Sequence, residues 1–466
     1  MITVSEENRE KFERFVEAVM EAGKARGLAA AVIDKNGSII YEKYWGYRDE
    51  ERQLPINRDT IFGLASVTKS FTSLAIMKLA EDGLISIDDP VSRYVPEFTN
   101  KNQTGAVKIW HLMCHTGGFF PLPRIVVDKV AEEMGLDEAV CGDLAYREDF
   151  AAEGVKRVAS RLDEQTKFLG RPGELFSYCN DGFGLLSDII RRVSGMSFAE
   201  YLEERILKPL GMDRSCCGFV SPSEDDNAAV LYSLENGSWR ADRDYHNDAF
   251  VLNGGGAMKS TISDMAKYIC MYLNEGIGLN GREIAGQYTV REMIKPRIDC
   301  RPDEYYGYGL ETKQLGLINV HEHGGSLPGV SSNLAFSYEL GAGVMILCNT
   351  MDVSVGAVSD AAMRMISGCD PIPKRPEYPK ISWTEEFIRQ ISGDYVSGEG
   401  DAFRLWLKED GTPGMEVNGK EVELVPVCEY RGLVRKRFGD MFLQIEHDRT
   451  RGIWGARYGS RVFPKI

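Results

Sequence analysis

A serine and a lysine three positions apart, Ser66 and Lys69, stand at the start of an apolar segment that ends at Gly83. Apolar residues recur in this segment at helical spacing, and a glycine is typical of a helix end. Side chains three positions apart share one face of a helix, and the free N–H groups of its first turn point outwards. Burial lowers the pKa of a lysine, so its neutral amine could accept the serine proton. The pair predicts a nucleophile and its base, although an N-cap serine beside a solvated lysine would have the same spacing.

Two further triplets could complete such a site. One is Tyr-Cys-Asn at residues 178–180, after a Pro-Gly break, and the other is His-Gly-Gly at residues 323–325, where a predicted strand ends. Beside an ammonium group the pKa of Tyr178 would fall, so a phenolate could also act as base, and Tyr178 and Lys69 would share one proton. Asn180 could hold the lysine and a substrate amide. The tyrosine alone would be equally consistent with a packed loop aromatic.

Other chemistries are less well supported. His321 and His323, and His111 and His115, have spacings that could bind a metal ion. Neither pair has the acidic neighbour of a His-Glu-x-x-His motif, so we predict no metal and no cofactor. The three glycines at residues 254–256 lack the Gly-x-Gly-x-x-Gly spacing of a dinucleotide loop. No Gly-x-Ser-x-Gly elbow of an α/β-hydrolase is present in the sequence.

Composition indicates a folded protein with a large core. The chain has 466 residues, of which 43% are hydrophobic and 27% charged, and its net charge is −15. This acidity argues against nucleic acid and anionic membrane as partners. The N-terminus lacks the features of a signal peptide, and no apolar run is long enough to cross a bilayer. The ten cysteines include no Cys-x-x-Cys pair. We therefore expect a cytoplasmic protein with reduced thiols.

The elements around the triplets predict an α+β domain over residues 1–370. An amphipathic helix is expected at residues 6–22, and a charged, helix-rich lobe at about 127–167. Strands are predicted at residues 28–34, 38–45, 316–323, 331–337 and 341–348. Because each group of strands is followed or preceded by a helix, we expect one antiparallel sheet, flanked by helices, that joins both ends of the domain.

The sequence pattern changes after a proline-rich linker at residues 371–380. Apolar residues alternate with polar ones beyond it, and Asp-Gly and Asn-Gly pairs separate the alternating segments. This pattern predicts a small all-β domain at residues 381–466, a barrel or a strongly curved sheet. Its acidic and basic residues are nearly equal in number, so the negative charge lies mainly in the first domain.

In this order the three triplets resemble the serine β-lactamase and penicillin-binding protein family, in particular its class C-like branch. The His-Leu-Met-Cys-His-Thr-Gly-Gly run at residues 111–118 and the Pro-Leu-Gly-Met run at 209–212 are also similar. The resemblance covers about residues 8–368 and implies a β-lactamase/transpeptidase-like fold. It also implies a hydrolase in which Ser66 is acylated, with its N–H and that of Ser326 forming the oxyanion hole. The residues so implied are Ser66, Lys69 and Tyr178 for catalysis, and Asn180, His323, Gly324, Gly325 and Ser326 for substrate binding.

The third triplet departs from class C β-lactamases, in which it begins with a lysine that attracts the β-lactam carboxylate. His323 would be mostly neutral at pH 7. The His-Gly-Gly triplet and the all-β domain look more like D-aminopeptidases, whose catalytic domain precedes lipocalin-like barrels. We therefore expect a peptidase or amidase acting on short peptides with D-residues, and possible homo-oligomers. A carboxylesterase, a weak β-lactamase or a catalytically silent binding protein are the alternatives.

Overall fold

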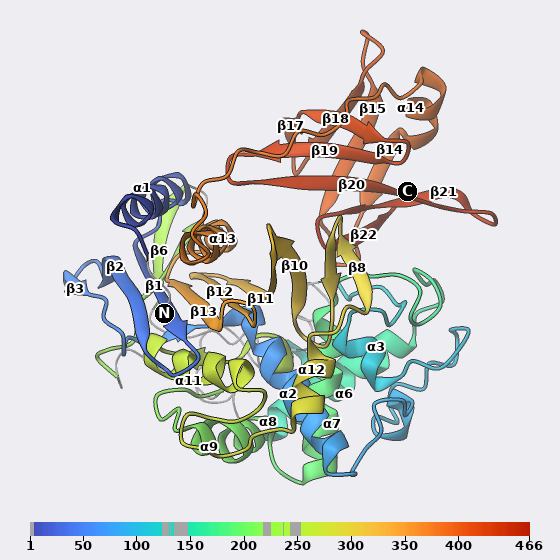
Figure 1. Ribbon diagram of the computed structural model, residues 1–466. Coiled ribbons are helices and arrows are strands. Elements are labelled where there is room, and N and C mark those ends of the chain that lie inside the picture. Colours follow the sequence, from blue (N-terminus) through green and yellow to red (C-terminus); the bar gives the residue numbers. More distant parts are fainter. Residues whose placement is uncertain are drawn as a thin grey trace.

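The computed structural model describes residues 4–123, 130, 132–134, 148–217, 225–235, 237–242 and 253–466. Helices and a large sheet form the greater part of the molecule, and the C-terminal strands lie at one end of it (Figure 1). None of the helices within these residues is both long and apolar enough to span a bilayer.

One antiparallel sheet organises the larger part. Within the described residues it has nine strands in the order β3-β2-β1-β13-β12-β11-β10-β9-β8. The strands are β1 (Gly27–Asp34), β2 (Ile39–Asp49), β3 (Leu54–Pro55), β8 (Ile298–Arg301), β9 (Glu304–Tyr306), β10 (Glu311–Leu315), β11 (Ile318–Leu327), β12 (Val330–Ser337) and β13 (Ala342–Cys348). Pairing of β1 with β13 confirms that both ends of the domain share one sheet. The sequence did not predict β8, β9 and β10, which extend the sheet toward the C-terminal part.

Helices cover both faces of this sheet (Figure 1). Alternate residues of β1 face opposite ways because the side-chain period of a strand is two. Leu28, Ala30 and Val32 belong to the core under α1 (Glu6–Gly23) and α13 (Val355–Ile366). Residues 29, 31 and 33 belong to the larger core that holds α2 (Thr68–Glu81) and α11 (Ile262–Leu273). The sheet is therefore the middle layer of three, and α2 is buried beneath it.

The remaining helices surround α2. They are α3 (Ile109–Met113), α6 (Glu148–Asp163), α7 (Asn180–Ser194), α8 (Phe198–Leu202), α9 (Lys208–Leu210), α10 (Asn253–Gly256) and α12 (Gln287–Met293), with the short helical turns η1 (Ala65–Val67), η2 (Val91–Arg93) and η3 (Glu203–Leu207). Two small ladders pair β4 (Phe62–Gly63) with β7 (Lys259–Ser260) and β5 (Leu231–Glu235) with β6 (Ser238–Asp242). Of the predicted helical lobe, α6 is described, whereas residues 124–129, 131 and 135–147 lie outside the described residues.

The C-terminal strands form two antiparallel sheets, and no closed barrel is formed by residues 381–466, all of which are described. One sheet contains β14 (Gly393–Val396), β15 (Ala402–Leu407), β16 (Pro413–Val417) and β17 (Lys420–Val422). The other contains β18 (Leu424–Cys428), β19 (Arg431–Lys436), β20 (Gly439–Asp448), β21 (Gly452–Tyr458) and β22 (Arg461–Pro464). Both sheets and α14 (Glu385–Ile391) share one hydrophobic core.

The expected lipocalin-like barrel therefore needs correction. Only Glu423 separates β17 from β18, so the chain passes from one sheet into the other without a hairpin that could pair these two strands. On the opposite side the sheets meet at a single bridge between Tyr395 and Lys465. Alternating apolar residues predicted the strands, but they carry no information on which consecutive strands pair.

Candidate active site

Ser66 lies in the turn η1, directly before α2, and its side chain is half-buried. The preceding residue, Ala65, has a φ of +47°, in the left-handed region that residues with a Cβ rarely adopt. Strand β11 passes close to this turn, because a Cβ at Gly325 would lie 3.0 Å from the Ser66 nitrogen and 2.3 Å from the Leu64 oxygen. A glycine is required there. The backbone nitrogen of Ser66 therefore lies beside β11.

Lys69 is buried in the first turn of α2, so it is not a solvated residue. Its Nζ donates to Asn180 Oδ1 at 2.9 Å and to the Gly255 carbonyl at 2.7 Å, and it lies 3.1 Å from Ser66 Oγ. The Asn180 and Gly255 oxygens can only accept, so they use both N–H groups of a neutral amine and leave its lone pair for the serine hydroxyl. No carboxylate within the described part of the chain forms an ion pair with Lys69. Burial, followed by the positive charge of Arg461, holds the pKa of Lys69 well below its usual range. A neutral amine beside a serine hydroxyl can accept its proton.

Tyr178 lies in the extended segment that leads into α7, and its hydroxyl hydrogen-bonds with Ser66. The Lys69 Nζ is 4.8 Å from the centre of its ring. Burial raises the pKa of Tyr178 despite this hydrogen bond and the charge of Arg461. The expectation of a lowered phenol pKa is therefore wrong, because desolvation penalises the phenolate and burial also disfavours the ammonium form of Lys69 that would stabilise it. With both groups neutral, Lys69 is the better acceptor of the Ser66 proton.

The partners of Lys69 come from two helices that meet α2. Asn180 is the first residue of α7, and Gly255 belongs to the four-residue helix α10. A Cβ at Gly254 would lie 2.3 Å from the Phe183 oxygen, so this glycine lets α10 pack tightly on α7. The glycine run thus supplies a carbonyl to Lys69. Sequence reasoning missed this role because the spacing of the glycines was compared only with phosphate loops.

His323 is buried on β11. It belongs to a series of hydrogen bonds in which each group accepts from the one before it and donates to the next. The Cys179 N–H donates to His115 Nδ1 at 3.0 Å, so neutral His115 has its proton on Nε2, 3.2 Å from Tyr306 Oη. The Gly324 carbonyl, 2.6 Å from His323 Nδ1, can only accept, so His323 Nε2 accepts from the Tyr306 hydroxyl at 2.7 Å. Burial lowers the pKa of His323 to about 3. It is neutral at pH 7, as expected.

Among the other predicted residues, Gly324 and Ser326 are exposed along β11 and Gly325 faces Ser66. The structure therefore brings all of the predicted residues to one place where α2, α7 and β11 meet.

Three groups of side chains in the structure have residue types that can bind a metal ion. The imidazoles of both histidine pairs hydrogen-bond to protein groups. Within the described residues, ligand atoms of Cys300, Glu304 and Glu311 lie within 4.8 Å of one another. The Arg301 guanidinium forms ion pairs with both glutamates, so a protein cation already neutralises this group.

The C-terminal sheet reaches the same place. The Tyr178 N–H donates to the Ser460 carbonyl at 2.8 Å, and the Val462 N–H donates to Ser177 Oγ at 3.2 Å. These bonds dock the start of β22 beside the segment that holds the phenol. A Cβ at Gly398 would lie 2.3 Å from the Pro121 oxygen, so a second loop of this region also touches the larger part closely.

A charged pair accompanies this contact. The Arg461 guanidinium lies 5.2 Å from the centre of the Tyr178 ring and forms an ion pair with Glu399. The arginine lowers the pKa of Lys69, and the glutamate raises it. No sequence signal pointed to either residue, because a charged residue at the start of a strand, like Arg461, or in a turn, like Glu399, has the pattern of a solvated surface.

Comparison with known proteins agrees with this geometry. A family model described as Beta-lactamase matches residues 12–365. Penicillin-binding protein 4* of Bacillus subtilis (strain 168) is 26% identical over 459 residues, which are 93% of each chain. Esterase EstB of Burkholderia gladioli is 32% identical over 207 residues, 44% of this chain and half of the esterase.

A solved structure is similar over nearly the whole chain. The octameric penicillin-binding protein homologue from Pyrococcus abyssi is 27% identical, with a TM-score of 0.68. The match covers 97% of this chain and 99% of that one. The shared architecture therefore includes the C-terminal strands.

Proposed function

The chain belongs to the beta-lactamase family and is a serine hydrolase, and we propose that it cleaves short peptides or amides containing D-amino acids through an acyl-enzyme at Ser66. The contact between a buried, uncompensated Lys69 amine and the Ser66 hydroxyl is the observation that supports this most strongly. A solvated or ion-paired lysine would stay protonated and could not act as a base.

In the proposed mechanism, Lys69 Nζ accepts the Ser66 proton as Oγ attacks the carbonyl carbon. The Asn180 and Gly255 oxygens stabilise the ammonium that forms. The N–H groups of Ser66 and Ser326 bind the oxyanion. Tyr178, which hydrogen-bonds with Ser66, passes the proton from Lys69 to the leaving group. Water then attacks the acyl-enzyme, and the same groups act in reverse.

The proposed substrates are small because β11 and the start of β22 border the site. The exposed edge of β11 at residues 324–326 offers backbone groups to a substrate, and the start of β22 covers the Tyr178 side. Neutral His323 supplies no positive charge for a β-lactam carboxylate. These features favour neutral or cationic peptides over β-lactams. The alternative of a carboxylesterase is supported by the similarity to esterase EstB.

We also propose the division into a catalytic domain at 1–370, a linker at 371–380 and a C-terminal domain at 381–466. Assembly into homo-oligomers is a further proposal, and the octameric Pyrococcus abyssi relative supports it. The cytoplasmic location stays a prediction.

The test has two stages. Intact mass after treatment with a fluorophosphonate should show one label on the native chain and none on Ser66→Ala. An unlabelled native chain would instead indicate a catalytically silent binding protein. Turnover of D-Ala-p-nitroanilide, its L-isomer, p-nitrophenyl acetate and nitrocefin then separates the activities. A clear preference for the D-anilide supports the D-peptidase, whereas turnover of the ester alone would replace it with the esterase.

A further inference from the structure

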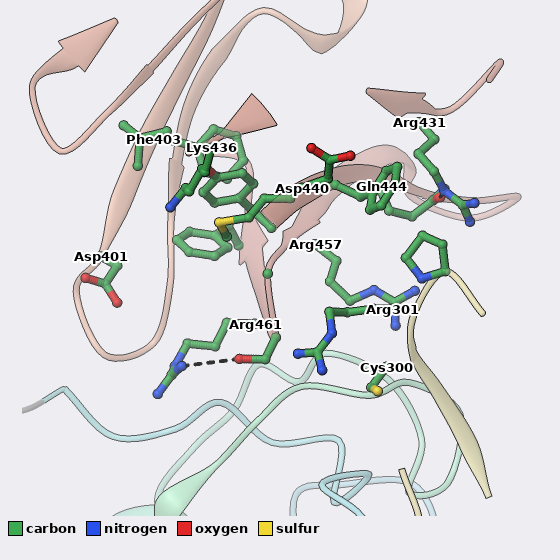
Figure 2. A pocket seen from close by; sticks show the side chains of 18 of the residues that line it. Cys300, Arg301, Asp401, Phe403, Arg431, Lys436, Asp440, Gln444, Arg457 and Arg461 are labelled. Carbon is green, nitrogen blue, oxygen red and sulfur yellow. Dashed lines mark hydrogen bonds between the residues drawn. The ribbon is translucent and has the colours of Figure 1, made fainter. Parts of the chain in front are cut away.

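A cavity of about 570 Å³ lies inside the C-terminal domain, where its two sheets face β8 of the catalytic domain. Figure 2 shows that side chains from both domains point into it. Its apolar wall includes Phe403, Val417, Phe442 and Phe463. A volume of this size is typical of sites for small molecules. It is separate from the contact between Lys69 and Ser66 and has no part in the mechanism above.

Cationic side chains outnumber acidic ones in the lining. The cations are Arg301, Arg431, Lys436, Arg457 and Arg461, and the acids are Asp401 and Asp440. Three of the cations have acidic partners outside the lining. These ion pairs are Arg301 with Glu304 and Glu311, Arg457 with Asp299 and Glu446, and Arg461 with Glu399. These three guanidiniums are therefore neutralised in the resting protein.

Two cations of the lining remain without an acidic partner. Neither Arg431 nor Lys436 forms an ion pair with any residue that the structure describes. Arg431 Nε donates to Gln444 Oε1 at 3.0 Å, which leaves the other guanidinium donors for a ligand. Both residues belong to β19, and Lys436 is exposed. They stand at the two ends of this strand, and each adds a positive charge without an acidic partner to the lining, which favours a negatively charged ligand.

Asp440 favours a ligand that carries a hydrogen-bond donor. Its Oδ1 is buried and has no hydrogen-bond partner, while its Oδ2 lies 3.7 Å from Arg435. A buried acceptor left unpaired is costly, and a ligand N–H or O–H would satisfy it. The lining thus offers three complementary features, namely unpaired cations, an unpaired acceptor and aromatic rings.

We propose that this cavity binds a small organic anion that also carries a hydrogen-bond donor and an apolar group. Arg431 holds the anionic group with its free guanidinium donors, and Lys436 at the other end of β19 adds positive charge to the cavity. Asp440 accepts from the donor, and the rings of Phe403 and Phe442 contact the apolar group. Two sources can supply a ligand of this chemistry. One source is the end of a peptide substrate bound at Ser66, since Arg461 lines the cavity and also lies over the Tyr178 ring, and the other is a separate molecule.

The probe is 8-anilinonaphthalene-1-sulfonate, which combines a sulfonate, an N–H and aromatic rings. Titration of the full chain, followed by fluorescence, should show one site. The double variant Arg431→Gln/Lys436→Gln should weaken the binding at least tenfold in Kd, as expected from the loss of a charge-assisted contact and of a second positive charge in the cavity. Fluorophosphonate labelling of Ser66 should stay unchanged. Arg404→Gln is the matched control, because Arg404 is an exposed β15 arginine outside the cavity.

Further arms keep the proposal falsifiable. Uncharged N-phenyl-1-naphthylamine should bind the native chain and the double variant equally. If the double variant does not fold, Lys436→Gln alone changes only an exposed side chain and should weaken binding threefold or more. The proposal is wrong if the sulfonate binds all variants equally, if Arg404→Gln has the same effect, or if the uncharged dye loses affinity in parallel.

Labelling at Ser66 identifies the source of the ligand. A fluorophosphonate with a long, carboxylate-terminated chain should displace the sulfonate if the distal part of a substrate fills the cavity, and a short alkyl fluorophosphonate should not. Retention of the sulfonate with both labels assigns a separate ligand to the same site. Sulfonate binding to Ser66→Ala must persist, since the cavity is independent of hydrolysis. Failure of the proposed function would therefore leave this test intact.

Discussion

Two regions of the molecule meet at Tyr178, and they differ in whether their buried charged groups have partners of opposite charge. On one side, α2 and α7 bury Lys69 and Asp181, and neither has an oppositely charged partner among the described residues. On the other side, the C-terminal strands bury Arg461 against Glu399. Burial lowers the pKa of Lys69 and raises that of Asp181 to about 6, whereas the pKa of Arg461 is raised.

The difference separates chemistry from positioning. Burial without a partner of opposite charge disfavours the charged form of each group, which makes it easier for the group to exchange a proton. A paired arginine keeps its charge and supplies a constant field instead. We therefore assign proton transfer to the helical side of the site, and a fixed electrostatic influence to the strand side. The predictions that follow test this assignment, from the largest expected effect to the smallest.

Removal of the nucleophile should have the largest effect. Ser66→Ala should lower kcat on the order of 10⁴ to 10⁶-fold for every hydrolysed substrate. The fold should survive, because Ser66 is half-buried and its side chain does not cap α2. Ester and anilide turnover by the purified variant measures the loss, and a circular dichroism melt checks the fold. Residual turnover within about tenfold of the native rate would place the nucleophile elsewhere.

Replacement of the base should have the next largest effect. Lys69→Met keeps the volume of the side chain but removes the amine, so acylation should slow about 10² to 10⁴-fold. Rates of fluorophosphonate labelling report acylation directly. In the native chain this rate should rise with pH and reach its plateau well below pH 10.5, because the Lys69 pKa is lowered. The control is Lys78→Met, a lysine of the same helix that donates to the Ile284 carbonyl far from Ser66 in the sequence. Equal loss in both variants would contradict the role of Lys69.

Buried Asp181 predicts a pH dependence of stability. Its carboxylate oxygen accepts from the Leu122 N–H at 2.9 Å, and burial raises its pKa from 3.8 to about 6. The folded chain therefore holds this proton more tightly than the unfolded chain does. The contribution is greatest below pH 4 and falls as pH rises to about 6, by on the order of 3 kcal/mol.

Asp181→Asn should remove this fall, since an amide stays neutral. The midpoint of denaturant unfolding, measured from pH 4 to pH 7, should decline less for the variant than for the native chain. Asp163→Asn is a useful contrast, because the pKa of that carboxyl is lowered from 3.8, so its stabilising effect is lost only at lower pH. Between pH 4 and pH 7 the curve of this variant should run nearly parallel to that of the native chain. Parallel curves for Asp181→Asn and the native chain would show that this carboxyl does not titrate in the range.

Prediction from sequence succeeded on the helical side and failed on the strand side. The spacing of Ser66 and Lys69 is local, and apolar periodicity placed α2 and α7 around them. Arg461 acts only because the start of β22 docks on residues 177–178, more than 200 positions away, and Glu399 acts because its turn pairs with Arg461. Strand β8 was not predicted from the sequence for a similar reason. It is four residues long, and its place in the sheet depends on pairing with β9. Long-range pairing of this kind leaves no local pattern to detect.

Substitutions of Arg461 and Glu399 test the comparison with the smallest expected effect. Arg461 lowers the pKa of Lys69 and Glu399 raises it. Arg461→Gln should therefore shift the rising limb of the acylation rate to higher pH, and Glu399→Gln should shift it to lower pH. Each shift should be well under one pH unit, a change of about threefold in rate at a fixed pH on the limb. The double variant should lie close to the native profile.

Shifts of opposite sign in the two pH profiles distinguish an electrostatic effect on Lys69 from the loss of a structural contact. Loss of either partner would disturb the docking of β22 in a similar way, so damage to the fold would move both profiles in the same direction or lower both plateaus. Labelling rates at Ser66, measured from pH 5 to pH 9 with Arg404→Gln as control, separate these outcomes. Shifts in the same direction would show that the strand side only supports the Tyr178 segment. Opposite shifts would mean that a domain remote in sequence sets the pH at which the Ser66–Lys69 pair becomes reactive.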